Sequence, residues 1–194
     1  MAQRARTNGF EVPGRLHAKL SEKAFAERLR RVKLFLCDVD GVLTNGTVLM
    51  GGGAEYKFFH IQDGLGLRLL QRSGIKVGWV SNRPSGATQQ RADDLKVDYL
   101  YQAQGSKVEA VEEILKKAGL AWDDISYMGD DVVDLGALRR CGMAIAVANA
   151  IDEAQALAHY VTRASGGCGA VREVVELILK AQNHWTGLIK HFQA

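Results

Sequence analysis

The sequence contains no long apolar run, and no stretch approaches the roughly 20 consecutive apolar residues that a transmembrane helix needs. A membrane span is therefore excluded. No apolar segment has the character of a signal-peptide core, so we expect a cytoplasmic protein. The composition, 47% hydrophobic and 24% charged residues, is typical of a globular chain, and 194 residues suit one domain because two halves would each be marginal.

Cysteine and histidine are both scarce and without pattern. There are three cysteines, an odd number with no metal-type spacing, and the five histidines form no HxH or HxxxH pair. These patterns argue against a disulfide framework and against a zinc site, which gathers Cys and His ligands at short spacings. Any metal should therefore be bound by oxygen atoms. The cysteines are Cys37, Cys141 and Cys168.

The net charge of +3 is divided unevenly along the chain. Residues 1–33 contain nine Lys or Arg and three Glu, whereas the rest of the chain is mildly acidic. A solvated basic arm followed by one helix explains this segment. Because it lacks interleaved aromatic residues and a recognisable binding fold, we expect no nucleic-acid partner. Salt-sensitive binding of DNA or RNA that disappears on deletion of residues 1–31 would argue otherwise.

The first third of the chain predicts a helix, a strand and a hairpin. Apolar residues at helical spacing predict an amphipathic helix over 15–31, and residues 32–37 are an apolar run typical of a buried strand. "TVLM" (47–50) and "AEYKFF" (54–59) flank three glycines, the pattern of a β-hairpin with a flexible tip. This hairpin is an insertion before the first helix of the units that follow.

From residue 64 onward, helical and apolar extended segments alternate with a short period. The alternation predicts an α/β fold, a Rossmann-like parallel sheet with helices on both faces. We divide the chain into an N-terminal arm and helix (1–31), one α/β domain (32–183) and a C-terminal tail (184–194). The expected strands are 75–80, 97–101, 125–128 and 143–147, and the expected helices are about 65–73, 85–95, 106–118, 132–141, 152–159 and 169–183.

Polar residues follow the predicted strands, at the edge of the sheet where ligands bind in such folds. Carboxylates, a hydroxyl group and a cation are the groups that phosphoryl transfer with Mg²⁺ requires, because Mg²⁺ prefers oxygen ligands and takes one or two carboxylates together with phosphate and water. In chain order these residues are Asp38 and Asp40, Ser81, Asn82 and Arg83, Lys107, and Asp130, Asp131 and Asp134.

Charge suggests a role for each group. Asp38 and Asp130 would bind Mg²⁺ with a main-chain carbonyl near Asp40, which offsets the repulsion between the carboxylates. Asp38 would attack phosphorus to give an aspartyl-phosphate while Lys107 neutralises phosphate oxygens. Asp40 would protonate the leaving oxygen and later take a proton from water. Ser81 and nearby N–H groups would hold the phosphoryl group.

Each piece alone has an ordinary structural explanation. An Asp before Gly is often a turn device, Ser81 and Asn82 before Pro84 can cap a helix, and Lys107 can be a solvated charge. It is the occurrence of all these motifs in one chain that favours a catalytic site over a purely structural explanation. Each piece stands after a strand or at a helix start, and they follow one another in the order that the chemistry needs.

With these motifs, the chain resembles the haloacid dehalogenase superfamily of phosphohydrolases. The match extends to its branch of 3-deoxy-D-manno-octulosonate 8-phosphate phosphatases and covers about residues 30–183. The stretches that carry it are "DVDGVLTNG", "GGGAEYKFFHIQDGLGLRLL", "LYQAQGSKVEA", "YMGDDVVDL", "AHYVTRASGG" and "GAVREVVELILKAQ".

The resemblance implies a core without a large cap domain, Mg²⁺ as cofactor, and a role in lipopolysaccharide synthesis. It implies a homotetramer in which the hairpin packs on neighbours and roofs the site. Arginine suits a substrate with a phosphate and a carboxylate, although from the residues alone Arg68 and Arg91 look like surface charges. The implied substrate-binding residues are His60, Ile61, Gln62, Asp63, Gly64, Arg68, Ser81, Asn82, Arg83, Arg91 and Lys107.

Two departures concern the substrate. Cys168 stands in "GGCGAVRE", where the family usually has arginine, and Ser81-Asn82-Arg83 replaces the common Thr-Gly-Arg but keeps the hydroxyl group. A phosphatase for a nonulosonate 9-phosphate, or for several sugar phosphates, is therefore the alternative. A non-catalytic oligomeric subunit is a further alternative, against which the complete set of catalytic residues argues.

Overall fold

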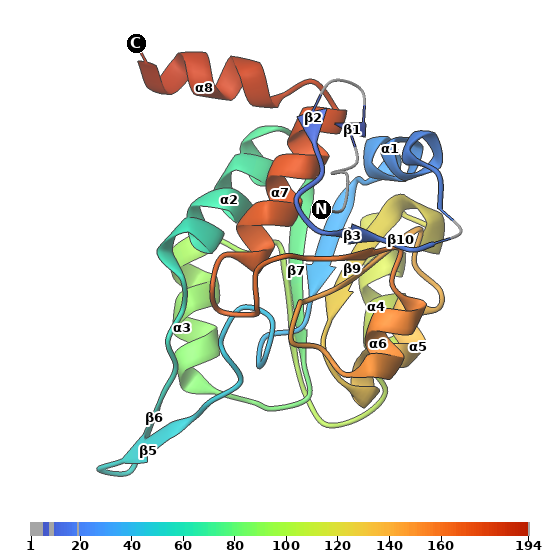
Figure 1. The fold of residues 1–194 in the computed structure, drawn as a ribbon. Helices are drawn as coiled ribbons and strands as arrows, with labels where there is room; N and C mark the ends of the chain where they lie inside the picture. The colour runs from blue at the N-terminus through green and yellow to red at the C-terminus, as the bar shows by residue number, and fades with distance from the viewer. Residues whose placement is uncertain (1–5, 8–9, 19, 194) are drawn as a thin grey trace.

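A seven-stranded sheet forms the centre of the molecule (Figure 1). The computed structural model describes residues 6–7, 10–18 and 20–193. The strand order is β3-β11-β10-β9-β4-β7-β8, and every pair is parallel except that of the edge strand β3 with β11. The bounds are β3 Arg15–Leu16, β4 Leu34–Cys37, β7 Lys76–Ser81, β8 Tyr99–Gln102, β9 Ile125–Gly129, β10 Met143–Ala146 and β11 Tyr160–Val161.

Helices cover both faces of this sheet, as the alternating pattern predicted (Figure 1). On one face α7 packs between α1 and α2, with α3 beyond α2; α4, α5 and α6 cover the other. The central strands β4, β9 and β10 are buried along their whole length, which explains why their sequences are mostly apolar. The helices are α1 Glu22–Arg31, α2 Ile61–Arg72, α3 Gly86–Leu95, α4 Lys107–Ala118, α5 Leu135–Leu138, α6 Asp152–Leu157 and α7 Ala170–Ala181.

The order of the strands creates a switch point beside β4. From β4 the chain moves to β7 and β8 on one side, then returns to β9 on the other side of β4 and continues outward to β10 and β11. The connections after β4 and β9 therefore leave in opposite directions, which opens a crevice beyond their carboxyl ends. Asp38 follows β4 and Asp130 follows β9, so both lie at this crevice.

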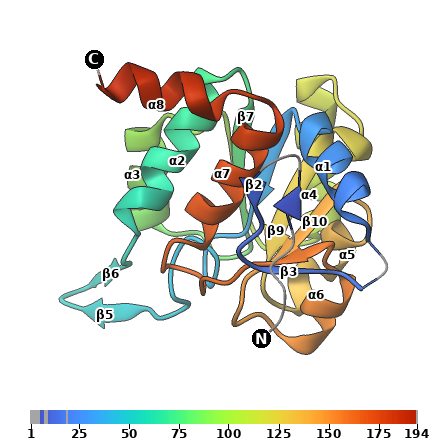
Figure 2. The ribbon, with the colours of Figure 1, turned by 45° about the horizontal axis from the view of Figure 1, so that its top comes forward.

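Two elements project from this core at opposite ends (Figures 1 and 2). The hairpin of β5 (Leu49–Gly51) and β6 (Ala54–Tyr56) is a separate antiparallel sheet, as expected for the insertion. At the other end lies α8 (Trp185–Gln193), a helix in the segment that we expected to be a tail. Among the described residues, no helix is both long enough and apolar enough to cross a membrane.

The N-terminal segment differs from the predicted helix over 15–31. The helix α1 begins only after Ser21, whose hydroxyl accepts a hydrogen bond from Ala24 N at 3.2 Å. Before it, β3 pairs with β11, and a short hairpin of β1 (Arg6–Thr7) and β2 (Phe10–Glu11) precedes β3. The prediction was wrong for the described residues before Glu22: residues 15–16 form a strand because the edge of the sheet offers them backbone partners, and the helix starts only after its cap at Ser21.

Candidate active site

Asp38, Lys107 and the pair of Asp130 and Asp134, all predicted from the sequence, meet at the crevice between β4 and β9. Asp38 N donates to Met128 O at 3.0 Å, so the ladder between these strands continues up to the carboxylate. Lys107 comes from the first turn of α4, where Ser106 accepts a hydrogen bond from Glu109 N and caps the helix. The side chains of Asp38 and Lys107 are 8% and 1% exposed, so both charges are buried.

Lys107 is held between two carboxylates. Its Nζ lies 2.7 Å from Asp38 Oδ1 and 2.7 Å from Asp134 Oδ1. Burial alone would lower the pKa of this ammonium, but the two carboxylates raise it above its ordinary value. Lys107 is therefore a fixed positive charge beside the oxygen that we predicted to attack phosphorus.

Asp134 organises this part of the site and is fully buried. Its Oδ1 accepts hydrogen bonds from Lys107 Nζ and from Tyr127 O–H, each at 2.7 Å, and its Oδ2 accepts from the N–H groups of Asp130 at 3.0 Å and Asp131 at 3.3 Å. One side chain thus fixes both the lysine and the loop after β9. Our sequence reasoning missed Tyr127, whose only signal was a polar tip in a buried strand just before the Gly-Asp-Asp turn.

Three carboxylates converge on a point that suits a divalent cation. One oxygen from each of Asp38, Asp130 and Asp134 lies within 4.8 Å of the others. Asp130 Oδ1 is buried and has no hydrogen-bond partner. Burial, with Asp38 and Asp134 nearby, raises the pKa of Asp130 to about 8, and burial raises that of Asp38 to about 6. A cation would satisfy the unpaired oxygen and offset the repulsion, so the residues present fit Mg²⁺.

These pKa values predict how metal and pH act on stability. Because the pKa of Asp38 and of Asp130 is raised from 3.8 to about 6 and 8, each carboxyl stabilises the metal-free fold below pH 4, and this contribution is lost as pH rises through those values. We expect the unfolding temperature without metal to fall from pH 5 to pH 8. At pH 8, Mg²⁺ at 100 times its Kd should raise it by about 5–10 °C, and at pH 5 by less.

The check is thermal unfolding in chelator and in Mg²⁺ at both pH values. Asp130→Asn should remove most of the Mg²⁺ shift at pH 8, whereas Asp123→Asn, an exposed carboxylate that pairs with Arg31, should leave it unchanged. An equal Mg²⁺ shift in Asp130→Asn and the wild type would contradict the assignment.

Glycines let three loops meet without intervening side chains. Gly41 has φ +105°, and a Cβ there would overlap the Asp130 carboxylate. A Cβ on Gly166 would overlap the carbonyl of Gly41, and Gly167 N donates to Val42 O at 3.0 Å. The loops after β4, after β9 and before α7 are therefore in direct contact around the carboxylates.

The residues after β7 lie at the same edge. The hydroxyl of Ser81 is buried and exchanges hydrogen bonds with the backbone of Arg83, whose N lies 3.1 Å from Oγ. Asn82 Nδ2 donates to Gly105 O at 3.0 Å, which ties this loop to the one before α4. The Arg83 guanidinium pairs with Glu55 of the hairpin. The structure thus connects this predicted site segment to the insertion.

The predicted substrate segment 60–64 begins α2 and is divided between surface and interior. Ile61 is 75% exposed and Gln62 is exposed, whereas Asp63 is 1% exposed. Asp63 Oδ1 accepts a hydrogen bond from Arg172 N at 2.7 Å, at the start of α7, and burial raises its pKa. His60 Nδ1 is buried without a hydrogen-bond partner. In this structure Asp63 joins two helices, and substrate contact stays a prediction.

The structure does not bring the two predicted helix arginines into contact with the catalytic carboxylates. Arg68 Nη1 donates to Gln71 Oε1 at 2.8 Å and to Leu95 O at 3.0 Å. Arg91 pairs with Asp94 at 2.6 Å and lies over Gly64, where a Cβ would overlap its guanidinium. It lines a cavity of about 790 Å³ between β6 and α3.

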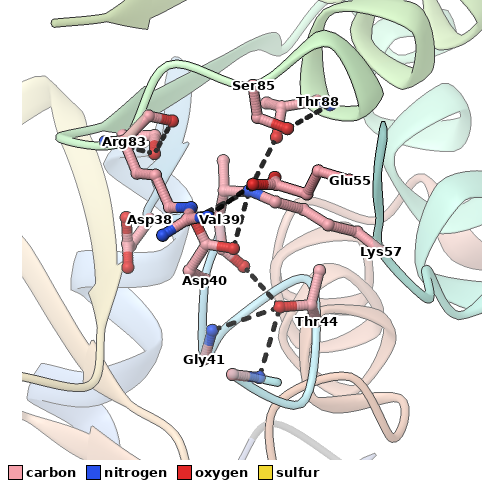
Figure 3. Close-up of polar contacts among 12 residues, drawn as sticks. Asp38, Val39, Asp40, Gly41, Thr44, Glu55, Lys57, Arg83, Ser85 and Thr88 are labelled. Carbon is pink, nitrogen blue, oxygen red and sulfur yellow. Dashed lines mark hydrogen bonds and ion pairs between the residues drawn. The ribbon is translucent and has the colours of Figure 1, made fainter. Parts of the chain in front are cut away.

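Asp40 makes a contact that the sequence analysis did not foresee (Figure 3). Lys57, just after β6, places its Nζ 2.7 Å from Asp40 Oδ1 and donates a hydrogen bond to Oδ2 at 2.9 Å. The hairpin therefore reaches into the site with a charged group. Asp40 keeps 21% of its side chain exposed and so can meet a ligand.

The site lies at the switch point of a parallel sheet. It combines a buried carboxylate beside a fixed ammonium, a second carboxylate two residues further along the chain, and a site for a cation. This combination defines a phosphoryl-transfer enzyme of Rossmann-like architecture. Comparison with known proteins gives the same class. Residues 96–174 match the family described as haloacid dehalogenase-like hydrolase.

Relatives share most of the chain. The protein is 40% identical over 162 residues to the 3-deoxy-D-manno-octulosonate 8-phosphate phosphatase KdsC of Yersinia pestis, covering 83% of this chain and 87% of the relative. The enzyme of the same name from Escherichia coli K12 is 38% identical over 156 residues, covering 80% and 83%.

A solved structure is similar in fold as well as sequence. The 3-deoxy-D-manno-octulosonate 8-phosphate phosphatase of Moraxella catarrhalis, in complex with a magnesium ion, a phosphate ion and a KDO molecule, superposes with a TM-score of 0.85 at 40% identity, covering 87% of this chain and 97% of that one. The chain belongs to the KdsC family of haloacid dehalogenase-like hydrolases.

Proposed function

We propose that this protein is a Mg²⁺-dependent phosphatase that converts 3-deoxy-D-manno-octulosonate 8-phosphate to the free sugar acid and phosphate, a step in lipopolysaccharide synthesis. The convergence of Asp38, Lys107, Asp130 and Asp134 at one switch point carries the proposal, since this set provides a nucleophile, a cation and a metal site. The relatives with that activity, at 38–40% identity, support the choice of substrate. The catalytic unit is residues 32–183.

Asp38 and Asp130, with the main-chain carbonyl of Asp40, would hold the Mg²⁺. The bound cation supplies charge that stabilises a phosphoryl group as negative charge moves onto its oxygens. The carboxylate of Asp134 already accepts four hydrogen bonds. Its role is therefore to position Lys107 and the loop that carries Asp130.

The side chains of the site divide the reaction between them. The Asp38 carboxylate attacks phosphorus as the bond from phosphorus to the sugar oxygen breaks, and Asp40 gives that oxygen its proton. In the second half Asp40 takes a proton from water, whose oxygen attacks phosphorus and releases Asp38 and phosphate. Lys107 and Ser81, with backbone N–H groups, hold the phosphoryl oxygens in both halves.

The remaining polar residues around the crevice would hold the sugar. Arg83 and Asn82 lie in the loop after β7, where Arg83 pairs with Glu55 of the hairpin and Asn82 bonds to the loop before α4. An arginine and an amide at this edge of the sheet suit an anionic substrate. We assign substrate contacts to residues 60–64 at the start of α2 as well. The complete proposed set is His60, Ile61, Gln62, Asp63, Gly64, Arg68, Ser81, Asn82, Arg83, Arg91 and Lys107.

The test is phosphate release from 3-deoxy-D-manno-octulosonate 8-phosphate, a nonulosonate 9-phosphate and several common sugar phosphates, in Mg²⁺ and in chelator. We expect Mg²⁺-dependent turnover with the highest kcat/KM on the octulosonate. Turnover centred on another sugar phosphate would keep the mechanism and change the substrate, whereas no metal-dependent turnover on any of them would refute the proposal.

We also propose a homotetramer in the cytoplasm. The hairpin supports the assembly, because Leu49, Met50, Tyr56 and Phe58 are each at least 55% exposed there, an apolar surface that another subunit would cover. Three unpaired cysteines are in keeping with a reducing compartment. Light scattering of the purified protein measures the assembly, and polar replacements at Met50 and Phe58 should dissociate it.

The loop before α7 offers a test of substrate affinity. Cys168 is exposed and follows Gly166 and Gly167, which contact the loop of the nucleophile. We expect Cys168→Arg to lower KM for the octulosonate phosphate about fivefold with kcat unchanged, because one partly exposed charge pair contributes up to about 1 kcal/mol. Cys168→Ala should leave KM as it is. Steady-state kinetics of the wild type, Cys168→Arg and Cys168→Ala measure this difference. Equal KM values in the three proteins would place the loop outside the substrate site.

A further inference from the structure

In the hairpin, apolar side chains are exposed to solvent while a charged side chain between them is buried, the reverse of the usual arrangement. The apolar residues Tyr56 and Phe58 are 55% and 67% exposed, whereas the side chain of Lys57 between them is 0% exposed. Burying an ammonium group is unfavourable unless charges and hydrogen bonds compensate it. The position of Lys57 is therefore set by its partners and not by a tendency to avoid water.

The partners of Lys57 come from three parts of the fold (Figure 3). Asp40 belongs to the loop after β4, and both its oxygens lie within 2.9 Å of Nζ. Thr88, fully buried in the first turn of α3, accepts a hydrogen bond from Nζ at 3.1 Å, and Glu55 of β6 lies 3.6 Å away. These contacts hold the ammonium from several sides and link the hairpin to α3 and to the loop after β4.

The contact between Lys57 and Asp40 also fixes the carboxylate. Among the side chains that the structure describes, those of residues 12–18 and 20–193, Lys57 is the only one that donates a hydrogen bond to Asp40. Asp40 differs in this from Asp38, which Lys107 holds, and from Asp134, which has four donors. Without Lys57, the Asp40 carboxylate would lose this hydrogen bond and the ion pair that accompanies it.

We propose that Lys57 is the positioning residue for Asp40: it holds the carboxyl group in the orientation that delivers a proton to the leaving oxygen. The inference rests on the proposed function, in which Asp40 is the acid and base. The hairpin then has a part in catalysis, since it carries the residue that aims the general acid. Lys57 acts through Asp40 and need not touch the substrate.

The dependence on leaving group tests this role. An alkyl oxygen such as that of a sugar phosphate needs a proton as it leaves, whereas the phenolate of p-nitrophenyl phosphate does not, and a general acid contributes about 10²–10⁴-fold. We expect Lys57→Met to lower the single-turnover rate of aspartyl-phosphate formation about 100-fold for the sugar phosphate and less than about fivefold for p-nitrophenyl phosphate, with little change in substrate affinity. The single-turnover rate isolates this step from the hydrolysis of the aspartyl-phosphate, in which Asp40 acts on the same intermediate whatever the leaving group. Lys57→Arg should restore part of the loss.

Two comparisons separate positioning from a general structural effect. In an Asp40→Asn background, Lys57→Met should cause no further loss, because its effect passes through that carboxylate. Lys76→Met, which removes a lysine 2.9 Å from Asp98 at the start of β7, is the matched control and should keep full activity. Thr88→Val removes a partner of Lys57 without removing the charge and should show the same preference for leaving group, to a smaller degree.

Three results would overturn the proposal: equal losses of the single-turnover rate on both substrates, weaker substrate binding with that rate unchanged, or additive losses of that rate in the double variant. If Lys57→Met does not fold, as judged by circular dichroism, Lys57→Arg and Thr88→Val supply the same comparison. A wild-type enzyme without phosphatase activity on either substrate would refute the proposed function itself. Wild-type turnover with no effect of Lys57 would refute only this inference.

Discussion

Asp38→Asn is expected to lower kcat by about 10⁴-fold or more while the protein remains folded. Asparagine has the shape of aspartate but no anionic oxygen, so it cannot form the bond to phosphorus. It also removes one negative charge from a cluster in which Asp130 and Asp134 lie close to Asp38. We therefore expect an unfolding temperature close to that of the wild type. Phosphate release and thermal unfolding, measured on the same preparation, check both parts.

A matched replacement guards against trace contamination and loss of structure. Asp123→Asn makes the same chemical change at an exposed carboxylate remote from the crevice and should keep full activity. The aspartyl-phosphate should be trapped by rapid acid quenching in the wild type and absent in Asp38→Asn. A fully active Asp38→Asn enzyme would remove the nucleophile assignment.

Lys107→Met is expected to affect stability and catalysis together. The ammonium compensates two buried carboxylates, and removing one partner of a buried ion pair typically costs about 3–5 kcal/mol. We expect the free energy of unfolding at pH 7, measured by urea denaturation in chelator, to fall by about 3 kcal/mol. We expect kcat to fall at least about 10³-fold, because a fixed cation is lost beside the phosphoryl oxygens.

The pH dependence of this loss identifies its cause. Burial raises the pKa of Asp38 to about 6 even with Lys107 present, so at pH 5 Asp38 is largely protonated and needs no cation. The destabilisation by Lys107→Met should therefore be smaller at pH 5 than at pH 7. Lys116→Met, at an exposed position of the same helix, should change neither quantity. A loss of stability that is the same at both pH values would indicate poor packing of the methionine as its cause.

The central fold could be predicted because its signals are local. Each buried strand from β4 to β10 is a short apolar run, and the helices between them have clear starts, such as Ser85 and Ser106. The strands β3 and β11 escaped prediction because each has only two residues, too few for any period to appear. They exist because they complete the edge of a sheet that the rest of the chain has already built.

The catalytic carboxylates could be predicted for the same reason, since each follows a recognisable strand. Lys57 could not. On a strand, Glu55 and Lys57 share one face, and a charged face beside Tyr56 and Phe58 indicates solvent. The structure buries that face because Asp40 and Thr88, which lie far away in the sequence, supply the partners. Interactions of this kind leave no local pattern.

The contact of three glycine-lined loops around the carboxylates has a consequence for how such an enzyme can change. Where Gly41 and Gly166 touch, there is no room for a new side chain, so mutation there would displace the loops that hold the nucleophile and Asp130. The hairpin tip and Cys168 are exposed and bear no such restriction. Activity on new substrates would thus be acquired by substitutions at the hairpin tip and at Cys168. A library aimed at altered specificity should vary these positions and keep Gly41 and Gly166.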